Sequence, residues 1–151
     1  MKFQVVANVY EWNDASLIGA LHIELGGSPF PEKRWAGSVS ETLIMWTENL
    51  MSLLEAGPGG EEEFLFLGSV YSFSIHQNGA SQAVVSLLEN AKPQDNPVYE
   101  VSFFSVVSAV YFTIDTLIDD SRFDEVQQVR RLKNMTQRLI KASEAHGYHF
   151  E

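Results

Sequence analysis

Serine and histidine alternate along one short segment, the pattern in this chain that most resembles a nucleophilic catalyst. Ser72, Ser74 and His76 occupy every second position, so on a β-strand their side chains project from the same face. Residues two apart on a strand are separated by about 7 Å, too far for a histidine to take a proton directly from a serine. The chain also lacks the Gly-x-Ser-x-Gly turn of serine hydrolases. We therefore expect a polar strand face and no catalytic residue.

The four histidines are the remaining candidate metal ligands, because the absence of cysteine excludes thiolate sites, disulfides and thiol catalysis. His146 and His149 are three residues apart, but Gly147 is expected to end a helix between them, so they need not share a face. With His22 and His76 on strands, a four-histidine zinc site is conceivable. The sequence lacks an HxxxH or HExxH motif, however, and it predicts no metal and no other cofactor.

One glycine-rich loop, Gly57-Pro58-Gly59-Gly60, is the candidate phosphate-binding segment. It is followed by Glu61-Glu62-Glu63 instead of a lysine or a helix N-terminus, and this negative charge would repel phosphate. The sequence therefore argues against a nucleotide site. General acid/base catalysis needs a buried carboxylate pair, whereas adjacent carboxylates such as these and Asp119-Asp120 are usually solvated. The three glutamates are better suited to docking a cationic partner.

The net charge of −10 is unevenly distributed. Residues 1–121 carry 16 acidic and 4 basic side chains, a net of −12, whereas residues 122–151 carry 4 acidic and 6 basic side chains, a net of +2. Such an acidic bulk disfavours nucleic acid, which binds Lys and Arg through its phosphates. It favours a protein partner with a basic surface, because complementary charge speeds encounter. The alternative is that the charge serves solubility alone.

Hydrophobic periodicity and turn residues predict the elements that would position these side chains. Asn13-Asp14 and Asn78-Gly79 indicate hairpin turns, and the spacing of Ser38 and Glu41 fits a helix capping box. The order ββαββββαα predicts a single α+β domain over residues 1–151, with a mainly antiparallel sheet and about three helices packed on one face. The expected strands are 3–10, 17–25, 63–67, 70–76, 83–88 and 98–103; the expected helices are 39–56, 105–120 and 124–145; a polar loop is expected at 92–97.

Alternation along the expected strands divides their side chains between two faces. If Leu21, Ile23 and Phe73 face the helices, a polar set faces the opposite way and forms either a rigid platform for a protein partner or a plain solvated surface. That set is His22, Glu24, Ser72, Ser74, His76, Glu100 and Ser102. The residues we expect to contact a partner are Glu61, Glu62, Glu63, Glu24 and His76 as charge partners, and Tyr71 and Trp12 as aromatic anchors.

A further pattern begins at Phe30-Pro31-Glu32-Lys33-Arg34-Trp35. It continues with a helix containing Leu43 and Trp46, and then with Phe64-Leu65-Phe66-Leu67-Gly68-Ser69-Val70-Tyr71. Over roughly residues 28–76 the chain resembles immunity proteins, small bacterial proteins that neutralise the toxins of contact-dependent or secreted polymorphic systems. The resemblance implies a non-catalytic inhibitor of a toxin domain. An acidic inhibitor would suit a basic toxin such as a nuclease, by mimicking phosphate charge. The same aromatic residues also fit simple packing, with Trp35 under the start of the helix.

Two other functions are compatible with the sequence. A small enzyme or ligand-binding domain would have a pocket between sheet and helices, lined by Trp35, Trp46 and Tyr111. A homo-oligomer is possible because Phe103–Ile118 is more apolar than one domain needs to bury. The start of the chain lacks the apolar run of a secretion signal, and no segment approaches about 18 continuous apolar residues, so we expect a cytosolic protein that binds no membrane.

Overall fold

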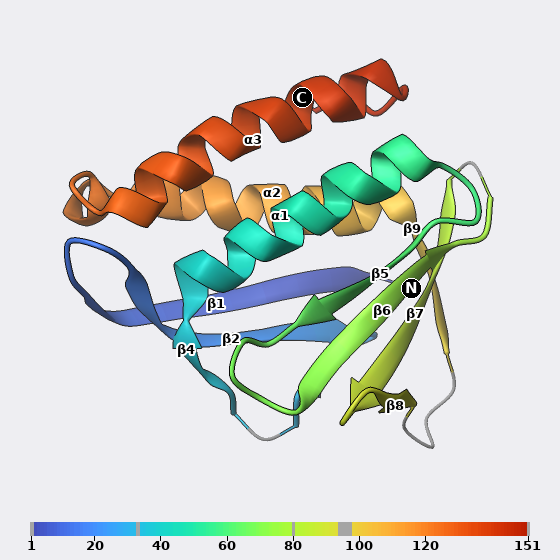
Figure 1. The fold of residues 1–151 in the computed structure, drawn as a ribbon, viewed down its shortest axis with the longest axis horizontal. Coiled ribbons are helices and arrows are strands. Elements are labelled where there is room, and N and C mark those ends of the chain that lie inside the picture. The colour runs from blue at the N-terminus through green and yellow to red at the C-terminus, as the bar shows by residue number, and fades with distance from the viewer. Residues whose placement is uncertain (1, 33, 80, 94–97, 151) are drawn as a thin grey trace.

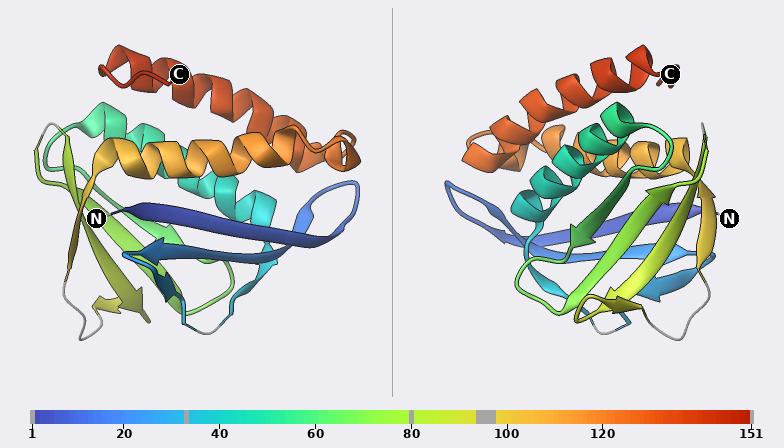
Figure 2. Two further views of the ribbon diagram at one scale, coloured as in Figure 1. Left: turned by 180° about the vertical axis from the view of Figure 1, so that it is seen from behind. Right: turned by 45° about the vertical axis from the view of Figure 1, so that its right-hand side comes forward.

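The computed structural model describes residues 2–32, 34–79, 81–93 and 98–150 (Figure 1). Three helices lie together on one side of two antiparallel sheets, whose strands run at a marked angle to each other (Figures 1 and 2). Sheet A contains β1 (Phe3–Trp12), β2 (Leu17–Leu25), β3 (Ser28–Phe30) and β4 (Ala36–Ser38). Sheet B contains β5 (Glu61–Leu65), β6 (Tyr71–Gln77), β7 (Gln82–Glu89), β8 (Lys92–Pro93) and β9 (Tyr99–Ser102). The helices are α1 (Val39–Ala56), α2 (Phe103–Ile118) and α3 (Gln127–Ala145), and the 3-10 turn η1 (Ser121–Phe123) precedes α3.

Sheet A is built on the long hairpin of β1 and β2. Phe3 pairs with Leu25 at its open end, and the register shifts between Val9 and Glu11. The short strands β3 and β4 both pair with the other side of β2. Within the described residues β1 therefore forms an outer edge of this sheet, with β2 alone as its neighbour.

The turn between β1 and β2 also completes the start of α3. The side chain of Asn13 accepts a hydrogen bond from the N–H of Ala15 at 2.8 Å, which closes the turn. The carbonyl oxygens of Asp14 and Ala15 accept the N–H groups of Gln127 and Gln128 at 2.7 and 2.9 Å. The first N–H groups of a helix have no partner within the helix. Here the hairpin turn supplies partners for two of them.

Sheet B is centred on β6 and β7. Strand β6 pairs with β5 and β7, and β7 pairs along its other edge with both β8 and β9. Phe73 of β6 lies opposite Phe64 of β5, and both side chains are fully buried toward the helices. The side chains at alternate positions point outward, as expected for a sheet with one covered face.

The helix ends follow local sequence signals. The hydroxyl of Ser38 accepts the N–H of Glu41 at 3.2 Å, as the capping-box spacing predicts. Helix α1 ends at Gly57, and α3 is followed by Gly147; both glycines have positive φ, 70° and 87°. After α3 the N–H of Tyr148 donates back to the carbonyl of Ser143 at 2.9 Å, a common way to close a helix. None of the described helices combines the length and apolar character needed to cross a membrane.

An aromatic cluster fills the space between the helices and the sheets. Trp46 of α1 is fully buried, and its ring centroid lies 5.3 Å from that of Phe66 and 5.2 Å from that of Phe73. Trp35 contacts the same Phe66 from the other side, at 5.9 Å. The indole N–H of Trp46 donates to the carbonyl of Leu65 at 2.8 Å, so this polar atom is satisfied inside the core.

The predicted α+β fold with antiparallel strands and three helices is confirmed, but the strands divide into two sheets. Alternation along a strand identifies its two faces and does not identify its partner strands. The short strands β3, β4 and β8 were not predicted because two or three residues are too few to establish a period. Of the predicted loop at 92–97, Lys92 and Pro93 form β8, and residues 94–97 lie outside the described part of the chain.

Two helix starts differ from the prediction. Helix α2 begins at Phe103, because β9 passes directly into it at Ser102 without an intervening loop. Helix α3 begins at Gln127, three residues after the expected start at Asp124. The side chain of Asp120 accepts the N–H of Arg122 at 3.1 Å and starts the separate 3-10 turn. Asp120 therefore caps the 3-10 turn, whereas α3 follows Val126 without a side-chain cap.

Candidate partner-binding surface

The outer face of sheet B brings together residues that are far apart in the sequence. Glu61 pairs with His76, His76 pairs with Val84, and Val84 pairs with Glu100, so the four residues form one row across β5, β6, β7 and β9. Directly opposite residues of an antiparallel sheet project from the same face. The row therefore has a carboxylate at each end and the imidazole of His76 between them.

A second row lies beside the first. Glu63 pairs with Ser74, which pairs with Ser86. Together we call Glu61, Glu63, Ser74, His76 and Glu100 the acidic face. Glu61, Glu63 and Glu100 are exposed, whereas Ser74 and His76 are partly buried between their neighbours.

One glutamate of the acidic face is held in place by a hydrogen bond. The hydroxyl of Ser72 donates to Oε2 of Glu63 at 2.6 Å, and Ser72 itself is only 2% exposed. A bond from a buried hydroxyl to a carboxylate is short and strong compared with a neutral one. It restricts the rotamers of Glu63, so this charge is fixed relative to the sheet before any partner arrives.

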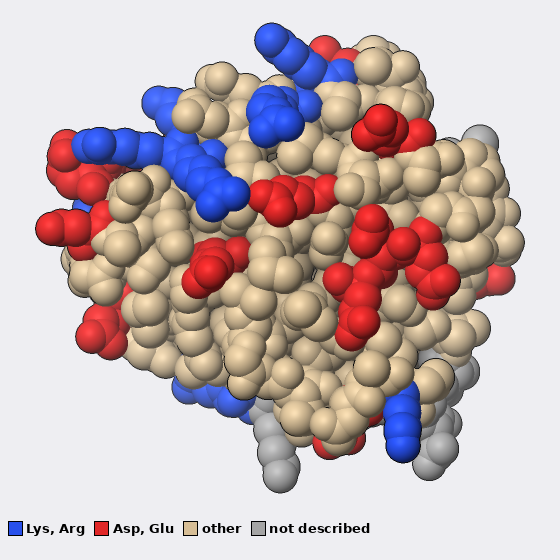
Figure 3. All heavy atoms as spheres, in the orientation of Figure 1, with Lys and Arg blue, Asp and Glu red and all other residues tan. Residues whose placement is uncertain are grey.

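The acidic face borders an open groove of about 460 Å³. Its lining includes Glu61, Glu62 and Glu63 with Ser74 and Ser86, and it contains no Lys or Arg. The space-filling view shows acidic side chains gathered over β5 and β6, while the basic side chains of α3 lie on a separate part of the same view (Figure 3).

Among the described residues, no ion pair neutralises the charge of the three glutamates. Four ion pairs occur among the described residues, and none includes Glu61, Glu62 or Glu63. Neighbouring carboxylates without a cation repel one another, which costs the folded state free energy. An external cationic group would relieve that repulsion on binding.

Glu24 lies apart from the acidic face. It belongs to β2 in sheet A, where its Oε1 is 3.4 Å from Nε2 of His22. The polar platform expected from strand alternation is thus divided: His22 and Glu24 lie on sheet A, and Ser72, Ser74, His76, Glu100 and Ser102 lie on sheet B. Alternation placed each side chain outward but could not assign the strands to separate sheets.

The two expected aromatic anchors also lie elsewhere. Trp12 is 42% exposed at the end of β1, where its ring packs edge-on against Phe123 at 5.1 Å and beneath the guanidinium of Arg122. Tyr71 begins β6 on the side that faces the helices, half-buried, with its ring 5.9 Å from that of Phe30. Of the seven predicted contact residues, the structure brings together Glu61, Glu63 and His76 on the acidic face. Glu62 lies opposite the buried Ile75 and lines the same groove from the other face of β5.

Ser72, Ser74 and His76, the residues that resembled a nucleophilic catalyst, lie along the outer face of β6. Ser72 uses its hydroxyl as a donor to Glu63, and His76 lies two rows away on the same strand. His22 and His76 are on different sheets, and Nδ1 of His146 lies 2.9 Å from the carbonyl oxygen of Ala142. Among the described residues no group of three or more His, Asp or Glu side chains has a geometry that could hold a metal ion.

The predicted pocket of Trp35, Trp46 and Tyr111 is wrong. Trp46 is fully buried among phenylalanine rings, so it lines no solvent-accessible space. Tyr111 lies on α2 and packs against Phe150 at 4.6 Å, in a different cluster. Burial raises the pKa of Tyr111, and the nearby carboxylates of Asp115 and Asp119 raise it further. Residue type alone does not show which side of the core each of these aromatic side chains occupies.

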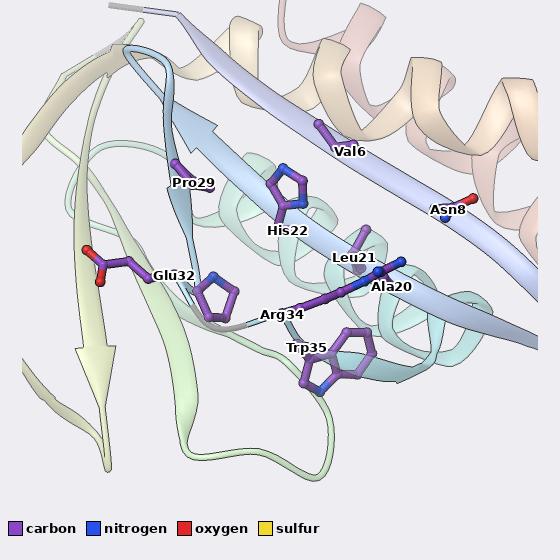
Figure 4. Close-up of a pocket in the computed structure, with 10 residues that line it drawn as sticks. Val6, Asn8, Ala20, Leu21, His22, Pro29, Glu32, Arg34 and Trp35 are labelled. Carbon is purple, nitrogen blue, oxygen red and sulfur yellow. The ribbon is translucent and has the colours of Figure 1, made fainter.

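A different hollow, which the sequence reasoning missed, lies on the outer face of sheet A. It has a volume of about 370 Å³, and its lining includes Val6, His22, Arg34 and Trp35. Arg34 extends along the outer face of β2 below His22 (Figure 4). One feature of the sequence could have pointed to this hollow. Basic residues are rare in residues 1–121, which contain only four, and Arg34 is one of them.

No protein-family model, curated protein or solved structure matches this chain. The acidic face is therefore interpreted from its own geometry and charge.

Proposed function

We propose that this protein is a non-catalytic binding module that uses the acidic face to occlude a basic surface of a protein partner. The observation that carries the proposal is the row Glu61, His76, Val84, Glu100, continued by Glu63, on one face of a hydrogen-bonded sheet. These carboxylates come from strands that are separated in sequence, so the fold itself assembles the negative surface.

The geometry favours recognition by a preformed surface. Main-chain hydrogen bonds hold β5, β6, β7 and β9 in fixed register, and the bond from Ser72 orders Glu63. A surface that is already ordered loses little conformational entropy on binding. Clustered charge of one sign also steers an oppositely charged partner and speeds association.

The narrower proposal is that the partner is a toxin domain and that the chain is an immunity protein. The resemblance of residues 28–76 to such proteins supports it, as does the net charge of −12 over residues 1–121. A basic active site that normally binds phosphate, such as that of a nuclease, presents the charge that this surface complements. Covering that active site would inhibit the toxin without any catalytic residue in the inhibitor.

The test begins with the neighbouring reading frame: if it encodes a toxin-like domain, that domain is produced as a catalytically inactive protein. Glu61→Lys/Glu63→Lys is expected to weaken its binding by more than about 100-fold, mostly by slowing association. Glu11→Lys/Asp14→Lys is the matched control, because it changes the net charge equally at exposed positions outside sheet B. Binding should also weaken as salt rises from about 0.05 to 0.5 M.

Two results would overturn the proposal. Equal losses in the two charge-reversal variants would mean that overall charge, and not the acidic face, determines binding. Tight binding that is indifferent to salt and to Glu61→Lys/Glu63→Lys would assign the interface to another surface. If the adjacent domain is acidic or does not bind, the proposed immunity function is wrong. The broader proposal of a basic protein partner is then tested with the same variants against a different basic protein.

The hollow on sheet A favours a second candidate function, binding of a small ligand. Its volume of about 370 Å³ lies in the range of ligand sites, and its apolar floor is combined with the guanidinium of Arg34 and the imidazole of His22. An aromatic carboxylate such as benzoate matches this combination. Saturable NMR shifts confined to Val6, His22 and Trp35, lost in Arg34→Ala, would support it; shifts that do not saturate would exclude it.

A further inference from the structure

The outer edge of sheet A carries main-chain hydrogen-bonding groups that β2 does not use. The carbonyl oxygen of Val5 accepts a long, 3.5 Å hydrogen bond from the hydroxyl of Thr113 on α2, so it points away from β2. Successive residues of a strand direct their N–H and C=O groups to opposite sides. The main-chain groups of Phe3, Ala7 and Val9 therefore point the same way as those of Val5, toward the open edge of β1.

A groove lies at this edge between β1 and α2. Figure 2 shows the two elements side by side. The groove has a volume of about 620 Å³, and it is lined on one side by residues 2–5 and on the other by one flank of α2. That flank consists of small side chains, Ser105, Ser108 and Ala109, followed by Phe112, which is 53% exposed. The small side chains leave room beside β1 for another extended chain.

Over residues 3–10 the edge of β1 lacks charged residues and proline, two of the features by which sheet edges usually prevent pairing. Natural edge strands carry lysine, proline or inward-pointing charge, or they are short. Residues 3–10 contain no charged residue and no proline, and the strand continues to Trp12. Val6 and Tyr10 are also exposed, at 39% and 53%. An uncharged edge beside a groove is suited to receiving another strand.

We propose that the groove binds an extended peptide segment, which adds to sheet A as a strand antiparallel to β1. The segment is uncharged along most of its length and has a carboxylate at its carboxyl end. In the antiparallel arrangement that end lies beside Lys2, which is the one charged residue among the described residues that line the groove. This partner differs in chemistry from the basic partner of the acidic face, so the two sites are independent.

A second copy of the chain is a poorer occupant. Two β1 strands paired across a two-fold axis would place both α2 helices on the same face of the joined sheet, above the same strand edge. Because Thr113 reaches the edge carbonyl of Val5, α2 already extends over this edge and would collide with its symmetry mate. A peptide without a helix on that face meets no such obstruction.

The probe is a fluorescein-labelled peptide, Thr-Val-Thr-Val-Thr-Asp, with a free carboxyl terminus. We expect saturable binding by fluorescence anisotropy, and slower hydrogen exchange at the amides of Phe3, Val5, Ala7 and Val9. A version with N-methyl groups on the residues that bond to β1 should bind at least about tenfold more weakly, because it lacks those donors. Lys2→Glu should reverse the preference between this peptide and one that ends in Lys.

Ser108→Arg fills the groove from α2 and should abolish peptide binding, whereas Gln137→Arg on the exposed side of α3 should not change it. Both positions are helical and solvent-accessible, so the fold should survive, and unchanged circular dichroism melting would verify this. The proposal is overturned if the peptide shows no saturable binding up to about 1 mM, or if the N-methylated peptide binds equally well. It is also overturned if light scattering shows a β1-mediated dimer that Ser108→Arg dissociates.

Discussion

Individual polar atoms in the core of this protein have specific partners, and the tryptophans illustrate this. The indole N–H of Trp46 donates to the carbonyl of Leu65, and that of Trp35 donates to the carbonyl of Leu67. Both acceptors belong to the segment that leaves β5. Trp46 therefore holds the end of β5, the strand that carries Glu61 and Glu63, against α1, and Trp35 ties the segment after β5 to the chain between β3 and β4.

Replacing Trp46 with phenylalanine should destabilise the protein by about 2 to 4 kcal/mol. The substitution leaves a cavity among phenylalanine rings and leaves the carbonyl of Leu65 without its indole donor. Urea unfolding followed by circular dichroism measures the loss. Trp12→Phe, at a position that is 42% exposed, is the control and should cost less than about 1 kcal/mol. Equal losses would mean that Trp46 is less important to the core than its burial indicates.

At the scale of elements, the β1–β2 hairpin depends on close approach of its two backbones. The register shift between Val9 and Glu11 brings β1 against Gly19 of β2. A Cβ atom at Gly19 would overlap the carbonyl oxygen of Asn8 and would lie 2.9 Å from the Cα of Val9. Only glycine fits this position without moving main-chain atoms.

Gly19→Ala should therefore destabilise the protein by more than about 2 kcal/mol, although it adds a single methyl group. Gly79→Ala is the matched control, since a Cβ there meets nothing within 4 Å, and it should change stability by less than about 0.5 kcal/mol. Thermal and urea unfolding of both variants would measure the difference. A Gly19→Ala protein as stable as the control would show that the hairpin adjusts its register at little cost.

At the scale of the whole molecule, charge is separated between two regions. The acidic side chains over sheet B and the basic side chains of α3 occupy different parts of the surface (Figure 3). One ion pair joins α1 and α3, in which Arg131 contacts Glu48 at 3.1 Å between two exposed side chains. Such exposed pairs stabilise little, so the unpaired glutamates of β5 are not compensated at a distance.

Removing part of the acidic cluster should stabilise the free protein. Glu61→Gln/Glu62→Gln is expected to raise the free energy of unfolding by roughly 0.5 kcal/mol by reducing repulsion between adjacent carboxylates. Added salt should stabilise the unmodified protein more than the variant, because salt screens the same repulsion. Unfolding curves at low and high sodium chloride, with Glu11→Gln/Asp14→Asn as the control pair, would test this. A destabilised variant would mean that these carboxylates make favourable contacts in the folded state.

Local features of the fold were predictable, and pairings between distant segments were not. Helix α1 was predicted from Val39 to Ala56, because its apolar spacing, the Ser38 cap and the stop at Gly57 agree. The division into two sheets depends on which strands β2 and β7 accept as partners, a choice that alternation alone does not determine. For the same reason Glu61, Glu62 and Glu63 could be proposed as a cluster from sequence, while the strand register was needed to place Glu100 at the other end of the row that begins at Glu61.

The hairpin turn that completes α3 affects where the chain can change length. Turns on a protein surface usually accept inserted residues, because only the ends of the strands are fixed. The turn after β1 is different, because the carbonyls of Asp14 and Ala15 are the acceptors for Gln127 and Gln128. An inserted residue would displace these acceptors and leave the start of a remote helix uncapped. Variation in length during evolution, and insertion of a foreign domain in the laboratory, should therefore be excluded from this turn even though its side chains are exposed.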